Sequence, residues 1–234
     1  MKNKIVACLG WKYEPEWMID DLKKNLSWVD DFAILDCRDR DELWIHEGEY
    51  RLLLREMARE KGADWILITS PDERWEKDAG KKIREHTDNH KDKKILEFNL
   101  KELYHPLWYR IDGRFENKPR RRCYPLFDDQ VMAFQPIQCS SMPQDGDYEI
   151  IHLDVNIYHL KMIEASNRKL RTQIFKKLDP ENKFQDDYDY LDNEVGARMV
   201  RIKPERMYYP EYKKYEFKVP EKYLNEDIST DTSV

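Results

Sequence analysis

The chain has 234 residues, with 41 Lys and Arg against 47 Asp and Glu, so its formal net charge is -6. This length suits one domain with a sizeable core, and the negative balance provides no general field for attracting nucleic acid. No apolar stretch approaches the ~20 residues that cross a bilayer, and no secretory leader is present, so we expect a cytoplasmic protein. The four cysteines lack the paired spacing of a metal site.

The first half of the chain alternates short apolar runs with helical patterns. The expected strands are residues 5–9, 32–36 and 65–69, and the expected helices are residues 15–26, 48–61 and 74–86. Gly62 follows the second helix directly, which is the usual position of a glycine that ends a helix. Strands and helices that alternate through short connections predict an α/β fold with a Rossmann-like, mainly parallel sheet and right-handed crossovers.

The second half is more mixed. Further strands are expected at residues 94–100, 122–127, 131–134 and 149–153. A long amphipathic helix is predicted at 161–178, and it stops before Asp179-Pro180 because a proline disfavours helical backbone in the residue before it. We therefore expect an α/β domain at 1–178, a C-terminal extension at 179–222 that packs on it, and a disordered tail at 223–234.

A pair of acids follows the buried strand at 65–69. Ser70-Pro71 leads into Asp72 and Glu73, and ligands of open α/β sheets bind at this edge. Two neighbouring carboxylates repel each other unless a cation lies beside them, and a divalent cation that carries a diphosphate is a common solution. The alternative is an ordinary helix start, with Asp72 as its cap and Glu73 favoured by the helix dipole.

The motifs of several other nucleotide-binding and catalytic sites are absent from the sequence. A dinucleotide-binding turn needs several glycines, whereas residues 10–15 contain one. The chain also lacks a Walker sequence, a Gly-x-Ser-x-Gly elbow and an HExxH motif. A site that holds its diphosphate through a metal on a strand-end acid needs none of these glycines.

Four segments together resemble one family. Residues 14–17 after the first strand are similar to an Asn-Glu-Glu-like turn, and residues 35–41 are similar to an Asp-x-x-Ser-x-Asp segment. Residues 51–73 look like the lead-in to an Asp-x-Asp-Glu motif, with serine in place of the first acid, and residues 157–161 look like a His-Leu-Lys motif. In this order, over residues 4–165, they resemble the family 2 nucleotide-sugar glycosyltransferases, which have the GT-A fold.

The resemblance implies an inverting transferase that moves a sugar from a nucleoside-diphosphate sugar to an acceptor hydroxyl, assisted by Mn²⁺ or Mg²⁺. It implies that Asp72 binds the metal and that His159 supplies a second ligand or a direct hydrogen bond to the diphosphate, although a lone histidine here could instead be a satisfied core residue. The side chains expected to contact the donor are Leu9, Trp11, Asp36, Arg38, Arg51, Ser70, Asp72 and Glu73.

Inverting transfer also needs a general base that takes the proton of the acceptor hydroxyl. Asp112 is the first candidate because it lies in an aromatic and basic loop before a glycine, and aromatic faces suit sugar rings. Asp128 and Asp129 are comparable candidates, and each of the three could instead be an exposed turn acid.

Two further segments bear on the substrate. The basic run at 118–122 could bind a donor phosphate or an anionic acceptor through arginine, or be a solvated loop. The acidic and aromatic segment at 184–191 could cover the acceptor cleft, or its tyrosines could pack a small lobe.

Two alternatives to an ordinary glycan transferase remain open: a phage- or bacterial-type glycosyltransferase acting on nucleic-acid bases, and a catalytically silent module that binds nucleotide sugars. The sequence leaves the acceptor open among glycans, lipid-linked groups, proteins and modified nucleic acid, because one fold serves many products. It does not indicate the oligomeric state.

Overall fold

The computed structural model describes residues 2–38, 47–88, 92–116, 118–128, 130–132, 140, 142–144, 146–183, 185 and 187–216. The strands in these parts of the chain are β1 (Ile5–Trp11), β2 (Asp31–Asp36), β3 (Trp65–Ile68), β4 (Glu73–Trp75), β5 (Lys94–His105), β6 (Trp108–Arg110), β7 (Pro119–Pro125), β8 (Glu149–His159) and β9 (Met199–Arg201). The α-helices are α1 (Glu16–Asn25), α2 (Glu47–Glu60), α3 (Ala79–Thr87) and α4 (Ala165–Leu178).

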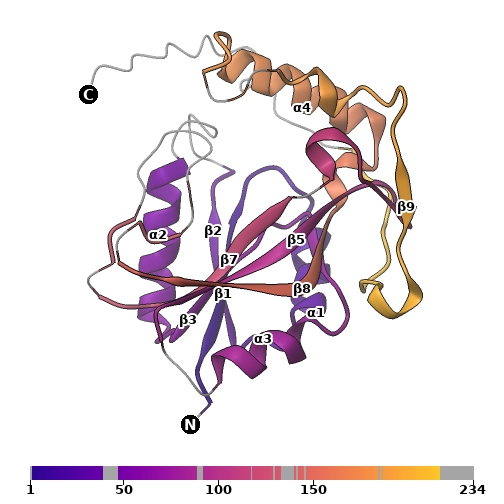
Figure 1. The fold of residues 1–234 in the computed structure, drawn as a ribbon. Helices are drawn as coiled ribbons and strands as arrows, with labels where there is room; N and C mark the ends of the chain where they lie inside the picture. The colour runs from indigo at the N-terminus through magenta and orange to yellow at the C-terminus, as the bar shows by residue number, and fades with distance from the viewer. Residues whose placement is uncertain are drawn as a thin grey trace.

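Within the described residues, all strands belong to one mixed sheet (Figure 1). Its main order is β2-β1-β3-β7-β5-β6-β9, and β8 pairs with both β5 and β4. The pairings β1–β2, β1–β3 and β5–β8 are parallel, and the other five are antiparallel. The α/β class is confirmed, but the expected mainly parallel sheet is wrong. The reason is that β6 and β7 turn back beside β5 without a crossover helix, which parallel pairing would require.

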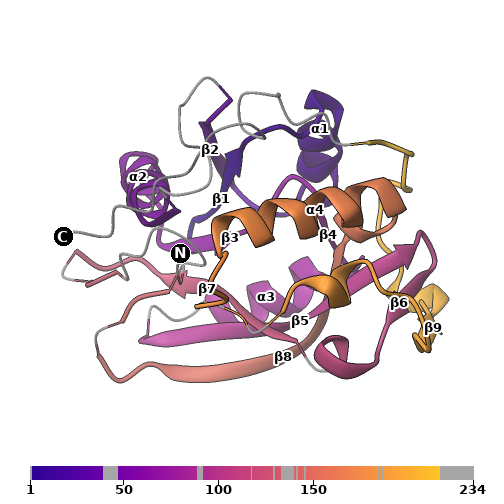
Figure 2. The ribbon, with the colours of Figure 1, turned by 90° about the horizontal axis from the view of Figure 1, so that it is seen from above.

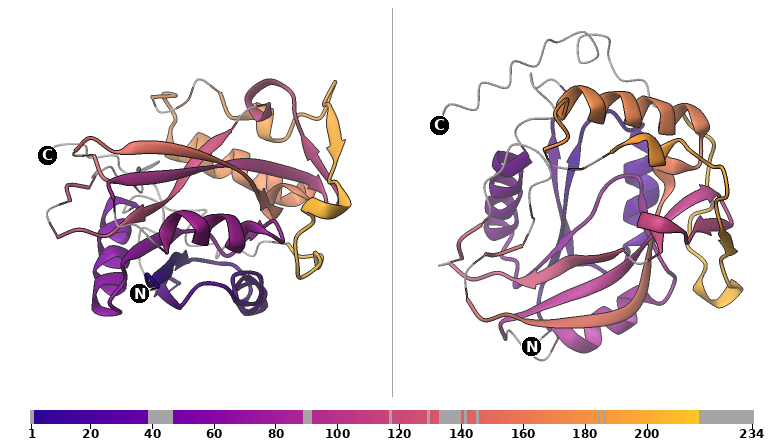
Figure 3. Two further views of the ribbon diagram at one scale, coloured as in Figure 1. Left: turned by 60° about the horizontal axis from the view of Figure 1, so that its bottom comes forward. Right: turned by 45° about the horizontal axis from the view of Figure 1, so that its top comes forward.

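Helices cover both faces of the parallel strands, as the two-residue period of β1 dictates. Ile5, Ala7 and Leu9 pack with α1 and α3 on one face. Val6 and Cys8 point to the opposite face and pack with α2. Figure 3 shows α2 separated by the strands from α1 and α3. The first five residues of β1 are therefore buried, and the strand is the centre of the parallel unit between β2 and β3.

The helix predicted at 74–86 is wrong in its first part. Residues Glu73–Trp75 form β4, which pairs antiparallel with the end of β8, and α3 begins later, at Ala79. Both Arg74 and Trp75 are buried. The guanidinium of Arg74 donates hydrogen bonds to the carbonyl oxygens of Pro71 and Glu73, so a charged residue is tolerated inside the fold.

Other element bounds also differ from the expectation. The strand predicted at 149–153 continues to His159, and the helix predicted from residue 161 begins as a 3₁₀ turn and becomes α-helical at Ala165. Of the strand predicted at 131–134, the described part forms only an isolated bridge between Met132 and Pro143, and its last two residues lie outside the described residues.

The C-terminal segment returns to the sheet. Strand β9 pairs with β6, and Tyr208 and Tyr215 pack in one cluster with Met18 of α1. Helix α4 runs over the carboxyl ends of the parallel strands (Figure 1 and Figure 2). The tail predicted at 223–234 lies outside the described residues. Among the helices that are described, none combines the length and the apolar character needed to cross a bilayer.

Candidate functional site

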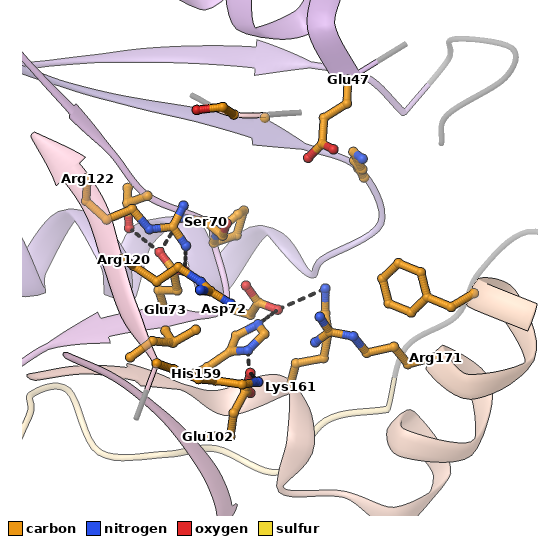
Figure 4. A pocket seen from close by; sticks show the side chains of 18 of the residues that line it. Glu47, Ser70, Asp72, Glu73, Glu102, Arg120, Arg122, His159, Lys161 and Arg171 are labelled. Carbon is orange, nitrogen blue, oxygen red and sulfur yellow. Dashed lines mark hydrogen bonds and ion pairs between the residues drawn. The ribbon is translucent and has the colours of Figure 1, made fainter. Parts of the chain in front are cut away.

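A cleft of about 820 Å³ opens where β1 and β3 end, and its walls come from α2, β5, β7 and α4 as well. This volume lies within the range of about 300–1,000 Å³ that is typical of ligand pockets. Ligands of open α/β sheets collect at the carboxyl ends of parallel strands, so the cleft occupies the expected edge. Figure 4 shows its charged side chains converging from several elements.

Asp72, His159 and Lys161 meet at the floor of this cleft. One oxygen of Asp72, Oδ2, lies 3.2 Å from Nε2 of His159 and 3.0 Å from Nζ of Lys161. The other oxygen, Oδ1, is buried and has no hydrogen-bond partner among the described residues. The structure thus brings together two residues 87 positions apart that the sequence assigned to one site.

The pairing of β4 with β8 positions these side chains. Glu73 is the register partner of His159, and the backbone N–H of Leu160 donates a 2.8 Å hydrogen bond to the carbonyl oxygen of Asp72. The turn between β3 and β4 is fixed by Glu73, whose carboxylate accepts hydrogen bonds from the hydroxyl of Thr69 and the backbone N–H of Ser70. Arg122 of β7 also contacts Glu73, at 2.5 Å.

The contacts between these groups determine their charge. Burial disfavours a charged Asp72, but Lys161 and His159 outweigh it and hold the pKa of the Asp72 carboxyl well below its usual range. Burial also opposes the charge of Lys161, yet Asp72 beside it raises the pKa of the ammonium group. The pKa of His159 is raised too, because Glu102 and Asp72 outweigh its burial.

The walls of the cleft carry more positive than negative side chains. The basic residues are Lys12, Arg51, Lys118, Arg120, Arg121, Arg122, Lys161 and Arg171, and the acidic ones are Glu14, Glu47, Asp72, Glu73, Glu97 and Glu102. Arg120 and Arg171 contact no carboxylate in the described part of the chain; Arg171 instead stacks on Phe175. A protein with a net charge of -6 therefore has a cleft suited to an anion.

Several residues expected at the donor lie in the cleft wall: Arg51, Ser70, Asp72, Glu73 and His159. Leu9, Trp11, Asp36 and Arg38 do not line it. The side chain of Leu9 is in the core, because its position in β1 faces α1 and α3. The guanidinium of Arg38 lies 3.5 Å from the centre of the Trp11 ring and pairs with Asp36, so these three contact one another on the surface.

The expected general bases are not in the cleft. Asp112 pairs with Arg110 at 2.8 Å, and hydrogen bonds from Arg110 lower the pKa of Asp112 to about 2. Asp128 is 99% exposed and pairs with Arg59. Asp129 lies outside the described residues. The described candidates are turn acids neutralised by arginine, and neither lines the cleft.

One cleft carboxylate was not anticipated as a site residue. Glu14 is 7% exposed, and its Oε2 accepts hydrogen bonds from the backbone N–H groups of Lys12 and Tyr13. No basic side chain of the described residues lies within ion-pair distance of it, whereas the other five cleft carboxylates each have such a partner. Burial raises the pKa of Glu14, with Lys161 opposing the shift.

Aromatic residues form part of the cleft wall. Phe175 of α4 stacks on Tyr188 with their ring centres 5.3 Å apart, and Tyr190 lies beside them in the same cluster. These residues, with Gln185 and Leu191, line the cleft. The described residues of the segment at 184–191 therefore line the cleft and also pack in this cluster, while the prediction that the segment covers an acceptor stays a prediction.

No model of a protein family matches the chain, and a search of curated proteins finds no match either. The function must therefore be inferred from the geometry of the cleft.

The residues at the cleft floor fit a divalent cation. The buried Oδ1 of Asp72 has no partner in the described part of the chain, and His159 offers an imidazole nitrogen next to the same carboxylate. Mg²⁺ is usually held through one or two protein carboxylates, with substrate phosphates and water as its other ligands. No three potential ligands cluster among the described residues, so phosphate and water would have to complete the coordination.

Proposed function

We propose that this protein is an inverting glycosyltransferase of the GT-A type, which moves a sugar from a nucleoside-diphosphate sugar to an acceptor hydroxyl. The observation that carries this proposal is the convergence of Asp72, His159 and Lys161 in a cation-rich cleft where β1 and β3 end. The cleft supplies basic side chains rather than a glycine-rich backbone turn, which suits a diphosphate held by charge.

The floor of the cleft binds the donor diphosphate. Asp72 and His159 would hold Mn²⁺ or Mg²⁺, which neutralises the charge of the departing diphosphate. Lys161, Arg120 and Arg171 bind the phosphate oxygens directly, because Arg120 and Arg171 have no carboxylate partner among the described residues and Lys161 already lies beside Asp72. These cations stabilise the negative charge that grows as the glycosidic bond breaks.

Glu14 accepts the proton of the acceptor hydroxyl. Its carboxylate is fixed by backbone hydrogen bonds and is not neutralised by a basic partner in the described residues. A buried carboxyl with a raised pKa is better matched to proton transfer near neutral pH than the arginine-paired Asp112. The aromatic wall of Phe175 and Tyr190 offers apolar faces for the sugar of the acceptor.

The test compares two buried carboxylates that each pair with two basic side chains. Asp72 pairs with Lys161 and His159, and Asp21, outside the cleft, pairs with Lys24 and Lys213. Removing the Asp72 charge leaves the largely buried His159 and Lys161 without their partner, whereas Lys24 and Lys213 beside Asp21 are exposed, so Asp72→Asn should destabilise the fold more than Asp21→Asn. Asp72→Asn should in addition lower the release of nucleoside diphosphate from the correct donor by about 100-fold or more.

The release assay uses a panel of nucleotide sugars with Mn²⁺, at a temperature where both variants are folded. Equal turnover by Asp72→Asn and Asp21→Asn would show that the proposed site is wrong. If the unaltered protein binds a nucleotide sugar without any release over hours, the alternative of a silent binding module is correct.

A further inference from the structure

Glu102 lies at the cleft floor and contacts His159. It lies on β5 as the register partner of His159 on β8, and it is 4% exposed. Its Oε2 is 2.6 Å from Nδ1 of His159, and its Oε1 accepts a 3.2 Å hydrogen bond from Nζ of Lys118. Figure 4 shows Glu102 on the side of the imidazole that faces away from Asp72.

This contact determines which nitrogen of His159 carries a proton. An ionised carboxylate can only accept hydrogen bonds. Glu102 also accepts a hydrogen bond from the ammonium group of Lys118, which is the contact of an ionised carboxylate. The short contact therefore requires a proton on Nδ1, which leaves Nε2 as the nitrogen that faces Asp72.

We propose that Glu102 is a positioning residue for the divalent cation: it fixes the Nδ1 proton and the ring orientation of His159, so that Nε2 and Asp72 face the same ion. This inference rests on the proposed metal-assisted transfer. A histidine that binds a metal usually donates its second N–H to a carboxylate, and loss of that partner weakens binding of the metal. Lys118 in turn holds the Glu102 carboxylate in place through its contact with the other oxygen.

The test replaces Glu102 by Gln, which keeps the shape but leaves one neutral acceptor oxygen for which His159 and Lys118 compete. The matched control is Glu76→Gln. Glu76 is 3% exposed, pairs with Lys82 at 2.9 Å and Arg206 at 2.7 Å, and does not line the cleft. Both variants lose a buried, doubly paired carboxylate, so a purely structural role for Glu102 predicts similar behaviour.

The measurement is the affinity for Mn²⁺ alone, followed by electron paramagnetic resonance of the free ion. We expect Glu102→Gln to weaken binding by about 10- to 100-fold and Glu76→Gln to leave it unchanged. A second readout is the Nδ1–H proton resonance of His159 in protein labelled with ¹⁵N-histidine and assigned with His159→Asn. It should move upfield in Glu102→Gln, where the hydrogen bond loses its charge, and stay in place in Glu76→Gln.

If the unaltered protein binds Mn²⁺ and Glu102→Gln binds it equally well, the role of Glu102 is wrong and the proposed function stands. If the unaltered protein does not bind Mn²⁺ even with a nucleoside diphosphate, the metal-assisted form of the function and this inference are both overturned.

Discussion

The buried carboxylates of the cleft differ in what neutralises them, and this difference assigns their roles. Asp72 contacts His159 and Lys161, and Glu73 contacts Arg122, so each of the two has a basic partner. Among the described residues, Glu14 has no such partner. Burial raises the pKa of Glu14, whereas cationic partners hold the pKa of Asp72 well below its usual range.

This contrast yields a prediction about pH. A general base acts only when it is deprotonated, so a raised pKa of Glu14 moves the acid limb of kcat above the ordinary glutamate value of ~4.3. Glu14→Gln should lower kcat by about 100-fold or more and remove that limb. Asp112→Asn, outside the cleft, should keep both the rate and the limb. A profile of kcat between pH 4 and 8 checks this. If Glu14→Gln has the same profile as the unaltered protein, the assignment of the general base is wrong.

The sequence predicts a site residue where a reactive side chain also stands at a recognisable position, such as the end of a buried strand or a short motif. Asp72 follows a buried strand, and His159 belongs to a short motif, so both could be placed at one site. Glu102 and Arg171 could not, because the register between β5 and β8 and the rotation of α4 decide that they face the cleft. The sequence also did not show that Asp112 pairs with Arg110 and lies outside the cleft.

At the scale of elements, local sequence patterns predict the first strands and helices, whereas the remaining strands depend on long-range pairing. β1, β2, β3, α1 and α2 form where apolar spacing predicted them. β4 was missed because three residues are too few to show a periodic apolar pattern. Their extended conformation depends on pairing with β8. The element that holds the acid pair in place is thus the one least visible in the sequence.

Helix α3 offers a prediction at this scale. Gly80 in its first turn packs directly on the ring of Trp28, and an added Cβ would lie within 2.7 Å of Cδ1 and Cδ2 of that ring. Gly80→Ala should therefore destabilise the protein by about 1–3 kcal/mol through overpacking. This outweighs the gain in helix propensity of up to ~1 kcal/mol.

Lys81→Ala is the matched control, because Lys81 is the next residue of α3 and is exposed. Its effect should stay within about 0.5 kcal/mol. Urea unfolding of both variants gives the comparison. A Gly80→Ala protein as stable as the unaltered one would mean that Trp28 can move aside at little cost.

For the whole molecule, the contrast between a negative chain and a cation-lined cleft leads to a prediction about ligands. A nucleoside diphosphate with Mn²⁺ at one hundred times its dissociation constant should add ~2.7 kcal/mol to the free energy of unfolding. For a protein of this size, this corresponds to a rise in Tm of roughly 5–10 °C. Thermal unfolding with a panel of nucleoside diphosphates, with and without Mn²⁺, measures it.

Salt provides the control for this experiment. Because part of the binding energy comes from Lys161, Arg120 and Arg171, the shift should shrink as the salt concentration rises. Absence of any shift across the panel would indicate that the cleft does not bind nucleotides. A shift of the same size without Mn²⁺ would assign the diphosphate to these side chains and not to a metal.

The pairing of β4 with the end of β8 also determines when the cleft floor can form during synthesis. During synthesis, the chain emerges from its N-terminus onward, so the parallel unit of β1, β2 and β3 can form while β8 is still unmade. At that stage Asp72 has neither His159 nor Lys161, and its carboxylate stays in water. The proposed donor site can therefore form only after β8 has been made and has paired with β4.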